Sequence, residues 1–236
     1  IVTKMGSVLI AYSGGADSTL LLKVTLDMLE GNVLAVTARA PIFPPSELSA
    51  AEEMAHQLGA RHLFVETGVL DDPHFSSNPP DRCYICKRRL FSRLKELAME
   101  HGLREVAEGS IQDDLSEYRP GLRAVQEIGV RSPLAEVGLS KAEVRLISQE
   151  TDLPVWNKPA QTCLATRFPY GERLSLENLK RVERAEAFLH SLGLGQLRVR
   201  NHGTLARIEV PKEDMARLLS EWSFKIVDKL KELGYA

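Results

Sequence analysis

The sequence lacks any long hydrophobic run. No apolar stretch among its 236 residues approaches the roughly 20 residues that a membrane-spanning helix needs. The first residues, IVTKMG, also lack the basic, apolar and small-residue succession of a signal peptide. The sequence therefore predicts a cytoplasmic protein without a membrane partner.

An excess of charge of either sign is absent as well. The chain has 30 basic and 32 acidic residues, which gives a formal net charge of −2. Proteins that bind nucleic acid without sequence preference usually carry a basic excess. We therefore do not expect a nucleic-acid partner, unless basic residues gather locally on the folded surface.

Cysteine is scarce, with three residues at Cys83, Cys86 and Cys163. An odd number in a chain without an export signal argues against a framework of disulfides. Metal binding or sulfur chemistry is the competing explanation for these residues.

What is present is an alternation of apolar segments and helical patterns. The patterns predict strands at residues 7–12, 33–38, 62–66 and 104–108 and helices at about 17–30, 47–58, 87–101 and 140–150. Strands that alternate with helices are typical of an α/β fold with a parallel sheet covered on both faces. We expect this domain to span residues 1–155.

A second, smaller α+β domain is expected at residues 156–236. The segment 153–171 breaks the periodic pattern with three prolines and reads as an ordered linker or an active-site loop. A helix capped by Ser175 follows it. Two alternating segments, at about 197–201 and 204–210, then predict a β-hairpin.

The stretch SVLIAYSGGADSTLLL joins an apolar strand to a helix through a loop with few side chains. Gly14 and Gly15 allow the backbone amides to form an anion-binding nest at the start of the helix. Ser13 and Ser18 offer hydroxyl donors to phosphate, and Asp17 is a candidate ligand for Mg²⁺. Taken alone, the loop is also compatible with a plain glycine turn.

The motif SGGxDS directly after an apolar strand resembles the PP-loop of ATP pyrophosphatases. The Walker and dinucleotide-binding fingerprints are both missing. The resemblance covers residues 7–150 and implies a five-stranded parallel sheet with ATP at the carboxyl ends of the strands. It also implies cleavage of ATP between its α- and β-phosphates, with adenylation of a carbonyl or carboxylate oxygen.

Further nucleotide contacts follow from this resemblance alone. They are Ala11, Thr37 and Ala38 in the adenosine pocket, and Gly109 beside the nucleotide. Asp113 and Asp114, in the EGSIQDD turn, would either assist Mg²⁺ or belong to a solvated turn, and the sequence leaves both readings open.

Segments outside the loop resemble the LarE family over essentially the whole chain. They are NPPDRCYICKRRLF, EGSIQDD, KPAQTCLATRFPYGERLS and the C-terminal LRVR. LarE proteins are ATP-dependent sulfur transferases of nickel-pincer cofactor synthesis. The resemblance implies that the substrate is pyridinium-3,5-biscarboxylic acid mononucleotide, whose carboxylates are adenylated and then thiolated. It also implies a homo-oligomer.

LarE proteins divide by the source of the sulfur. In one type a cysteine at the position of Cys163 gives up its own sulfur; in the other, three cysteines hold a 4Fe-4S cluster that carries an extra sulfide. Cys83, Cys86 and Cys163 stand at the positions of the second type, so we expect a cluster with one iron open. Three alternatives remain: zinc at the Cys-x-x-Cys pair, sacrifice of Cys163, and a persulfide on Cys163 served by a redox pair.

Three arginines are candidates for substrate binding. Arg198 and Arg200 are two residues apart on a predicted strand, so they project to the same face. The resemblance assigns the substrate phosphate to this LRVR segment; without it, two arginines on a solvated strand face would be the default reading. Arg167, close after Cys163, is the third candidate, and Glu209 is a weaker candidate for a secondary metal ligand.

Two other functions compete with sulfur transfer to a nucleotide. Related PP-loop enzymes thiolate tRNA, but the slightly acidic balance of this chain disfavours RNA. A regulatory module that only binds ATP is the other alternative. The intact Ser13 and Asp17, together with the three cysteines, argue against such an inactive site.

Overall fold

The computed structural model describes all residues from Ile1 to Ala236. The chain forms two compact units, each of which takes in two segments of sequence. The first, here called the sheet unit, comprises Ile1–Val69 and Pro80–Gln161. The second, here called the hairpin unit, comprises Leu70–Pro79 and Thr162–Ala236.

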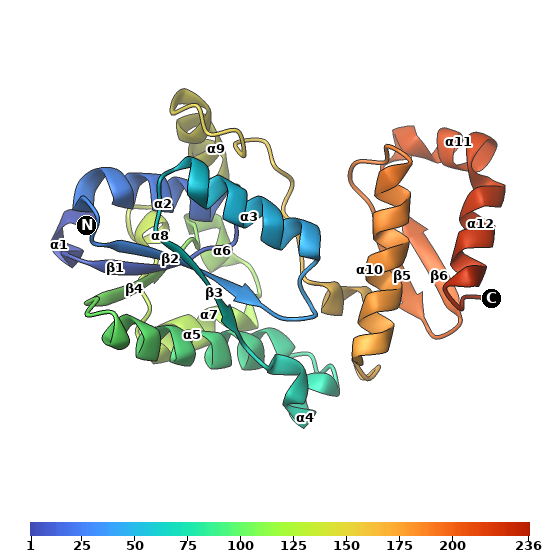
Figure 1. Ribbon diagram of the computed structural model, residues 1–236, viewed down its shortest axis with the longest axis horizontal. Helices are drawn as coiled ribbons and strands as arrows, with labels where there is room; N and C mark the ends of the chain where they lie inside the picture. The colour runs from blue at the N-terminus through green and yellow to red at the C-terminus, as the bar shows by residue number, and fades with distance from the viewer. The chain divides into compact units, whose positions relative to one another are not determined.

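The sheet unit is built on a parallel sheet with the strand order β3-β2-β1-β4 (Figure 1). The strands are β1 (Val8–Ala11), β2 (Val33–Arg39), β3 (His62–Glu66) and β4 (Glu105–Glu108). The two central strands are almost wholly buried because helices cover both faces of the sheet, which explains their continuous apolar sequence. The predicted α/β class and all four predicted strands are confirmed.

The sheet has four strands rather than the five that the PP-loop resemblance implies. At the position beyond β4, Arg131 forms a single parallel bridge to Ala107. The Arg131 amide donates to Val106 O at 2.9 Å, and the Glu108 amide donates to Arg131 O at 2.9 Å. Pro133 follows two residues later and begins a helix. Because proline has no amide hydrogen and fixes φ near a helical value, pairing stops after one residue.

Helices cover both faces of the sheet (Figure 1). The helices of the sheet unit are α1 (Val2–Met5), α2 (Ala16–Leu29), α3 (Pro45–Gln57), α5 (Arg82–Glu100), α6 (Gln112–Ser116), α7 (Pro120–Ile128), α8 (Pro133–Glu136) and α9 (Lys141–Glu150). One core packs β1 and β2 against α2, α3 and α9. The other packs the opposite face against α5 and α7. No helix of the protein combines the length and the apolar character needed to span a bilayer.

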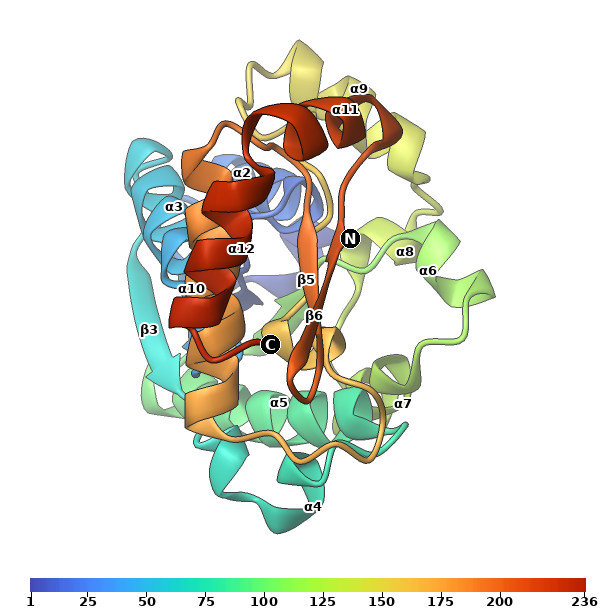
Figure 2. The same cartoon turned by 90° about the vertical axis from the view of Figure 1, so that its right-hand side faces the viewer.

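The hairpin unit packs helices against a two-stranded antiparallel sheet (Figure 2). Its elements are α4 (Pro73–Ser76), the 3₁₀ turn η2 (Leu164–Arg167), α10 (Leu176–Ser191), β5 (Arg198–His202), β6 (Leu205–Glu209), α11 (Lys212–Glu221) and α12 (Ser223–Glu232), while the 3₁₀ turn η1 (Val69–Asp71) lies where the chain passes between units. As predicted, Ser175 caps α10, its hydroxyl accepting from the Asn178 amide at 3.1 Å. The core of this unit joins α10, β5 and α12 around Leu189, Val199 and Ile226.

Residues 70–79 belong to the hairpin unit through hydrogen bonds that no local pattern predicts. Asn78 is fully buried, with φ at 56°, and its side-chain amide donates to Pro169 O at 2.8 Å. The Gly171 amide donates to Asn78 O at 2.9 Å, and the Leu174 amide donates to Ser76 O at 2.8 Å. The segment is therefore tied to residues 168–174, about 90 positions later in the chain.

Candidate active site

The glycine loop lies between the end of β1 and the start of α2. Gly14 has φ at +69°, in the left-handed region that favours glycine. A Cβ at this position would lie 2.8 Å from both Cα and Cβ of Ala51 in α3. Gly14 is therefore required both by its backbone conformation and by the close approach of α3.

The two serines predicted to bind phosphate are brought together in this loop. Ser13 Oγ and Ser18 Oγ lie 3.0 Å apart. The Ser18 hydroxyl also contacts Gly15 O at 3.2 Å, and the Gly15 amide donates to Ser13 Oγ at 3.4 Å. These bonds order the loop at the N-terminus of α2, where amide groups and the helix dipole favour an anion.

Asp17, the predicted Mg²⁺ ligand, already has a cationic partner. Lys141 Nζ lies 2.6 Å from Asp17 Oδ1 and 2.8 Å from Asp17 Oδ2. Lys141 is the first residue of α9, and sequence reasoning did not identify it. Lys141 therefore neutralises this carboxylate within the protein, and the role of Asp17 as a Mg²⁺ ligand stays a prediction.

A second ammonium group lies at the same loop. Lys158 Nζ donates to Gly14 O at 3.3 Å and pairs with Glu47 in α3 at 2.8 Å. This lysine comes from the proline-broken segment that the sequence identified as a linker or active-site loop. The glycine loop thus has two lysines beside it, although its own sequence contains none.

Asp113 and Asp114 both make contacts that shape the backbone. Asp113 Oδ2 accepts from the Lys141 amide at 2.7 Å, at the start of α9. Asp114 is buried, accepts from the Ile111 amide at 3.1 Å, and pairs with Arg119 at 2.8 Å. Both carboxylates therefore order the local backbone, and the burial of Asp114 differs from the solvated turn of the second reading. Assistance to Mg²⁺ stays a prediction.

The residues predicted for the adenosine pocket lie near the carboxyl ends of neighbouring strands. Ala11 ends β1 and pairs with Val36 of β2, directly before Thr37 and Ala38. Thr37 Oγ1 lies 2.8 Å from His62 Nε2 on β3, and burial lowers the pKa of His62 below its ordinary value. The chain therefore gathers Ala11, Thr37 and Ala38 at one edge of the sheet, where open α/β sheets bind ligands.

Gly109 follows β4 and lies against the start of α2. A Cβ at Gly109 would come within 3.0 Å of the Ser18 amide nitrogen and 3.1 Å of Ser18 Cα. The absence of a side chain at Gly109 therefore lets the end of β4 approach the glycine loop closely.

Cys83 and Cys86 lie in the first two turns of α5. Because they are three residues apart in a helix, they share one face. Cys83 is exposed and Cys86 is half-buried, and neither forms a disulfide. Between them, Tyr84 donates its hydroxyl hydrogen to Glu127 Oε2 of α7 at 2.7 Å, while Arg123 stacks 3.9 Å from its ring centre. These contacts fix the orientation of the cysteine-bearing turn.

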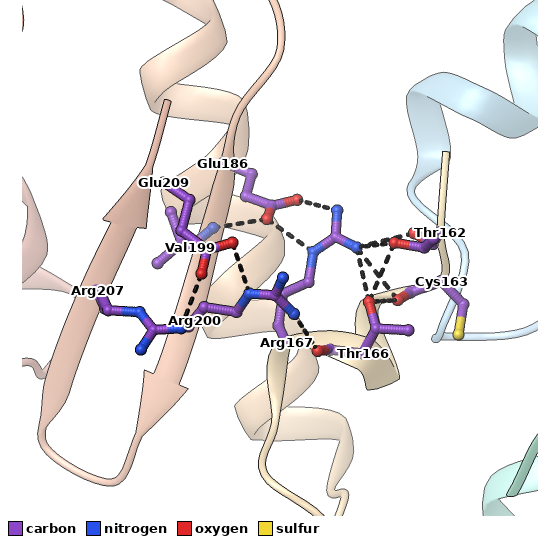
Figure 3. Close-up of polar contacts among 9 residues, drawn as sticks. All are labelled: Thr162, Cys163, Thr166, Arg167, Glu186, Val199, Arg200, Arg207 and Glu209. Atoms are coloured by element: carbon purple, nitrogen blue, oxygen red, sulfur yellow. Dashed lines mark hydrogen bonds and ion pairs between the residues drawn. The ribbon is translucent and has the colours of Figure 1, made fainter. Parts of the chain in front are cut away.

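Cys163 lies in the hairpin unit and caps η2. Arg167, at the end of this turn, is buried beside Glu186 of α10, with bonds of 2.9 and 3.1 Å between guanidinium and carboxylate. Its remaining nitrogen donates to Thr162 and Thr166 and to Cys163 O. Figure 3 shows this network, with the Cys163 sulfur pointing away from it. Arg167 supports the Cys163 loop, and any contact with substrate would require it to give up some of these bonds.

Arg198 and Arg200 lie on β5 of the predicted hairpin. Arg200 donates to Glu209 Oε2 at 2.9 Å and to Thr166 O at 2.7 Å (Figure 3). Burial alone would raise the pKa of Glu209, but hydrogen bonds from Arg200 and Arg207 outweigh it and hold that pKa below its ordinary value. Arg198 forms no ion pair within the protein, which leaves its charge available.

No group of three or more His, Cys, Asp or Glu side chains is arranged to hold a metal ion. Cys83 and Cys86 belong to the sheet unit, whereas Cys163 belongs to the hairpin unit. The predicted three-cysteine ligand set therefore stays a prediction.

A parallel α/β sheet with an SGGxDS loop at its carboxyl edge defines a protein of the PP-loop class. No protein-family model matches the chain. It is 40% identical, over 97% of its length and 83% of the relative's, to pyridinium-3,5-bisthiocarboxylic acid mononucleotide synthase of Lactiplantibacillus plantarum. The chain belongs to the family of this synthase, the LarE family.

Two uncharacterised proteins are similar over nearly the same span. One, from Synechocystis sp., is 47% identical over 96% of this chain and 85% of its own length. The other, from Methanocaldococcus jannaschii, is 32% identical over 98% of this chain and 88% of its own length. The similarity therefore covers both units in each of these relatives.

Proposed function

We propose that this protein is an ATP-dependent sulfur transferase that converts the carboxylates of pyridinium-3,5-biscarboxylic acid mononucleotide into thiocarboxylates. The observation that carries the proposal is family membership over both units. The close-packed glycine loop at the start of α2 supports a phosphate site there. The relative from Lactiplantibacillus plantarum is named for the bisthiocarboxylic product of such a reaction.

The first step is adenylation. A substrate carboxylate oxygen attacks the α-phosphorus of ATP, and pyrophosphate leaves. A carboxylate is a poor electrophile, and attachment of AMP gives its carbon a good leaving group. Loop amides at Gly14, Gly15 and the start of α2 stabilise the developing negative charge, and Ser13 and Ser18 contribute hydroxyl donors. Asp17 is the carboxylate that would hold Mg²⁺ beside the phosphates.

The second step is sulfur transfer, in which a sulfur nucleophile attacks the activated carbonyl carbon and AMP leaves. We propose Cys83, Cys86 and Cys163 as ligands of a 4Fe-4S cluster, a group that would supply a transferable sulfide on its open iron. Two thiols three residues apart on one face at the start of α5 suit this role, because they can reach one common group. Transfer of sulfur from Cys163 itself is the alternative.

Substrate binding falls to the hairpin unit. Arg198 has no ion pair of its own, and it shares a strand face with Arg200. A phosphate on the substrate would be bound by a fork of two guanidinium groups. Glu209, which pairs with Arg200, positions that arginine in the absence of substrate.

Pyrophosphate release tests the proposed function. We expect wild-type protein to release pyrophosphate from ATP when the dicarboxylate mononucleotide is present and to release none with bulk tRNA. Release only with tRNA would favour an RNA-modifying enzyme. ATP binding without release in either case would leave a regulatory binding module.

The sulfur source is tested by spectroscopy and mass spectrometry on anaerobically reconstituted protein. We expect iron and visible absorbance in the wild type, both lost in Cys83→Ala, with ATP binding unchanged. The polypeptide mass after one turnover should stay constant if the sulfide is borrowed. Loss of one sulfur mass would show instead that Cys163 is consumed.

A further inference from the structure

The glycine loop lacks the lysine that a Walker loop carries, but the fold brings one to it from far along the chain. Lys141 and Asp17 are 124 positions apart, and the Lys141 ammonium contacts both carboxylate oxygens at 2.6 and 2.8 Å. Each side chain is only about 30% exposed. This pair is therefore better shielded from solvent than an ordinary surface ion pair.

The backbone of Lys141 is fixed independently of this ion pair. Its amide donates to Asp113 Oδ2 at 2.7 Å. A capping box at the start of α9 adds a bond from the Ser140 amide to Glu143 Oε2 at 2.8 Å and one from the Glu143 amide to Ser140 Oγ at 3.3 Å. The ammonium is consequently delivered to the loop from an ordered helix terminus, and only the side chain has to move to change partners.

A metal ion bound at Asp17 would compete with this pair. Both carboxylate oxygens contact the ammonium, so Mg²⁺ and Lys141 carry like charge to the same two oxygens and repel each other there. The displaced ammonium stays tethered beside the anion-binding loop, where the phosphates of ATP are the nearest negative charge that binding introduces. A divalent ion and a lysine would then share the charge of the triphosphate.

We propose that Lys141 is an exchangeable counter-ion of the nucleotide site: it neutralises Asp17 in the absence of nucleotide and transfers to the ATP phosphates when Mg²⁺ binds Asp17. This inference rests on the proposed ATP site. It makes Lys141 a competitor of Mg²⁺ and a ligand of ATP at once, so its removal should change the two affinities in opposite directions.

The test is equilibrium binding of ATP to Lys141→Gln protein over a series of Mg²⁺ concentrations. At saturating Mg²⁺ the variant should bind ATP about 10-fold more weakly, the effect of losing one charge-assisted hydrogen bond. Its half-saturating Mg²⁺ concentration should fall by about 2- to 5-fold, because a partly exposed competing ion pair is gone. Binding of AMP, which lacks the β- and γ-phosphates, should change little.

Two further variants separate this role from a structural one. Lys141→Arg keeps a charge that can pair with both oxygens of Asp17, so its half-saturating Mg²⁺ concentration should not fall. Lys23→Gln removes a lysine of α2 that pairs with Asp27 and is as exposed as Lys141, at 33% against 30%, and both affinities should match the wild type. An unchanged or raised Mg²⁺ requirement in Lys141→Gln, or an equal loss of ATP and AMP binding, would overturn the inference.

The binding test of Lys141 can be decided separately from the proposed sulfur-transfer reaction. Wild-type protein that binds ATP but releases no pyrophosphate would contradict the proposed function and leave the binding test of Lys141 valid. Normal pyrophosphate release by the wild type, with ATP and Mg²⁺ affinities unaltered in Lys141→Gln, would contradict only the role of Lys141.

Discussion

At the scale of single residues, burial separates the arginines of the hairpin unit into two kinds. Arg167 is 2% exposed and donates two hydrogen bonds to Glu186, which is itself 8% exposed and also accepts from the Val199 amide at 2.8 Å. Arg207 is 60% exposed and contacts only Glu209. The sequence shows both as arginines among apolar residues, and it predicted Arg167 as a substrate-binding residue without any sign that this side chain is buried in an ion pair.

Replacing Arg167 by leucine should destabilise the protein strongly. Glu186 would be left buried without its partner, which typically costs about 3–5 kcal/mol. Arg207→Ala, the exposed comparison, should cost about 0–1 kcal/mol. Urea unfolding measures both; equal losses would show that the Arg167–Glu186 pair does not depend on burial. Adding Glu186→Leu to Arg167→Leu should recover a large part of the loss.

Replacing Arg198 by alanine should raise the KM for the mononucleotide, with little change in ATP affinity. Loss of a charge-assisted bond to phosphate corresponds to roughly a 10- to 100-fold increase in KM. Steady-state kinetics with each substrate varied in turn measures the effect, and Arg207→Ala serves as the control on the neighbouring strand. A KM equal to that of the wild type would remove Arg198 from the substrate site.

At the scale of secondary-structure elements, local signals predicted most of the fold. The capping serine Ser175 marks the start of α10. The alternation of β5 and β6 and the apolar runs of β1 and β2 are periodicities that the backbone satisfies on its own. The fifth strand that the resemblance implied is reduced to one bridge at Arg131, because Pro133 has no amide hydrogen to continue the pairing. The sequence did not identify Lys141 and Lys158, because periodicity shows which face of an element is buried. It does not show which distant side chain will lie beside the glycine loop.

Gly14→Ala, at the junction of β1 and α2, should lower the free energy of unfolding by more than the cost of a left-handed alanine alone. The comparison is Gly59→Ala, where φ is +70° and nothing lies within 4 Å of the added Cβ. A left-handed alanine costs about 1–2 kcal/mol at either site. Only at Gly14 does the new methyl group meet Ala51, at 2.8 Å, so unfolding and ATP-binding measurements should show a larger loss there. Equal losses would argue against the steric contact.

At the scale of the whole molecule, each unit is assembled from two separate stretches of chain. Residues 70–79 interrupt the sequence of the sheet unit but belong to the hairpin unit. Backbone hydrogen bonds from Gly171 and Leu174 hold them there. Composition and pattern could indicate a second domain after the proline-broken segment. They could not indicate that a ten-residue piece of the N-terminal region belongs to it, since that depends on long-range pairing around Asn78.

Asn78→Gly should loosen the hairpin unit selectively. Glycine tolerates the φ of 56° at this site, so the change removes the side-chain bond to Pro169 O without adding backbone strain. Amide hydrogen exchange should become faster at Gly171 and Leu174 and stay unchanged in β1 and β2. The control is Ser77→Ala, whose exposed hydroxyl bonds only to the neighbouring His74 O. Faster exchange throughout the sheet unit would contradict this selectivity.

The split origin of the hairpin unit bears on how the protein can be dissected. A fragment that begins at Thr162 would leave the carbonyl of Pro169 and the amides of Gly171 and Leu174 without their partners. Removing residues 70–79 from the other fragment would break the chain between β3 and α5, the helix that carries Cys83. The C-terminal fragment should therefore be stable only when residues 70–79 are supplied with it. The other fragment should be stable only when a short linker joins residue 69 to residue 80.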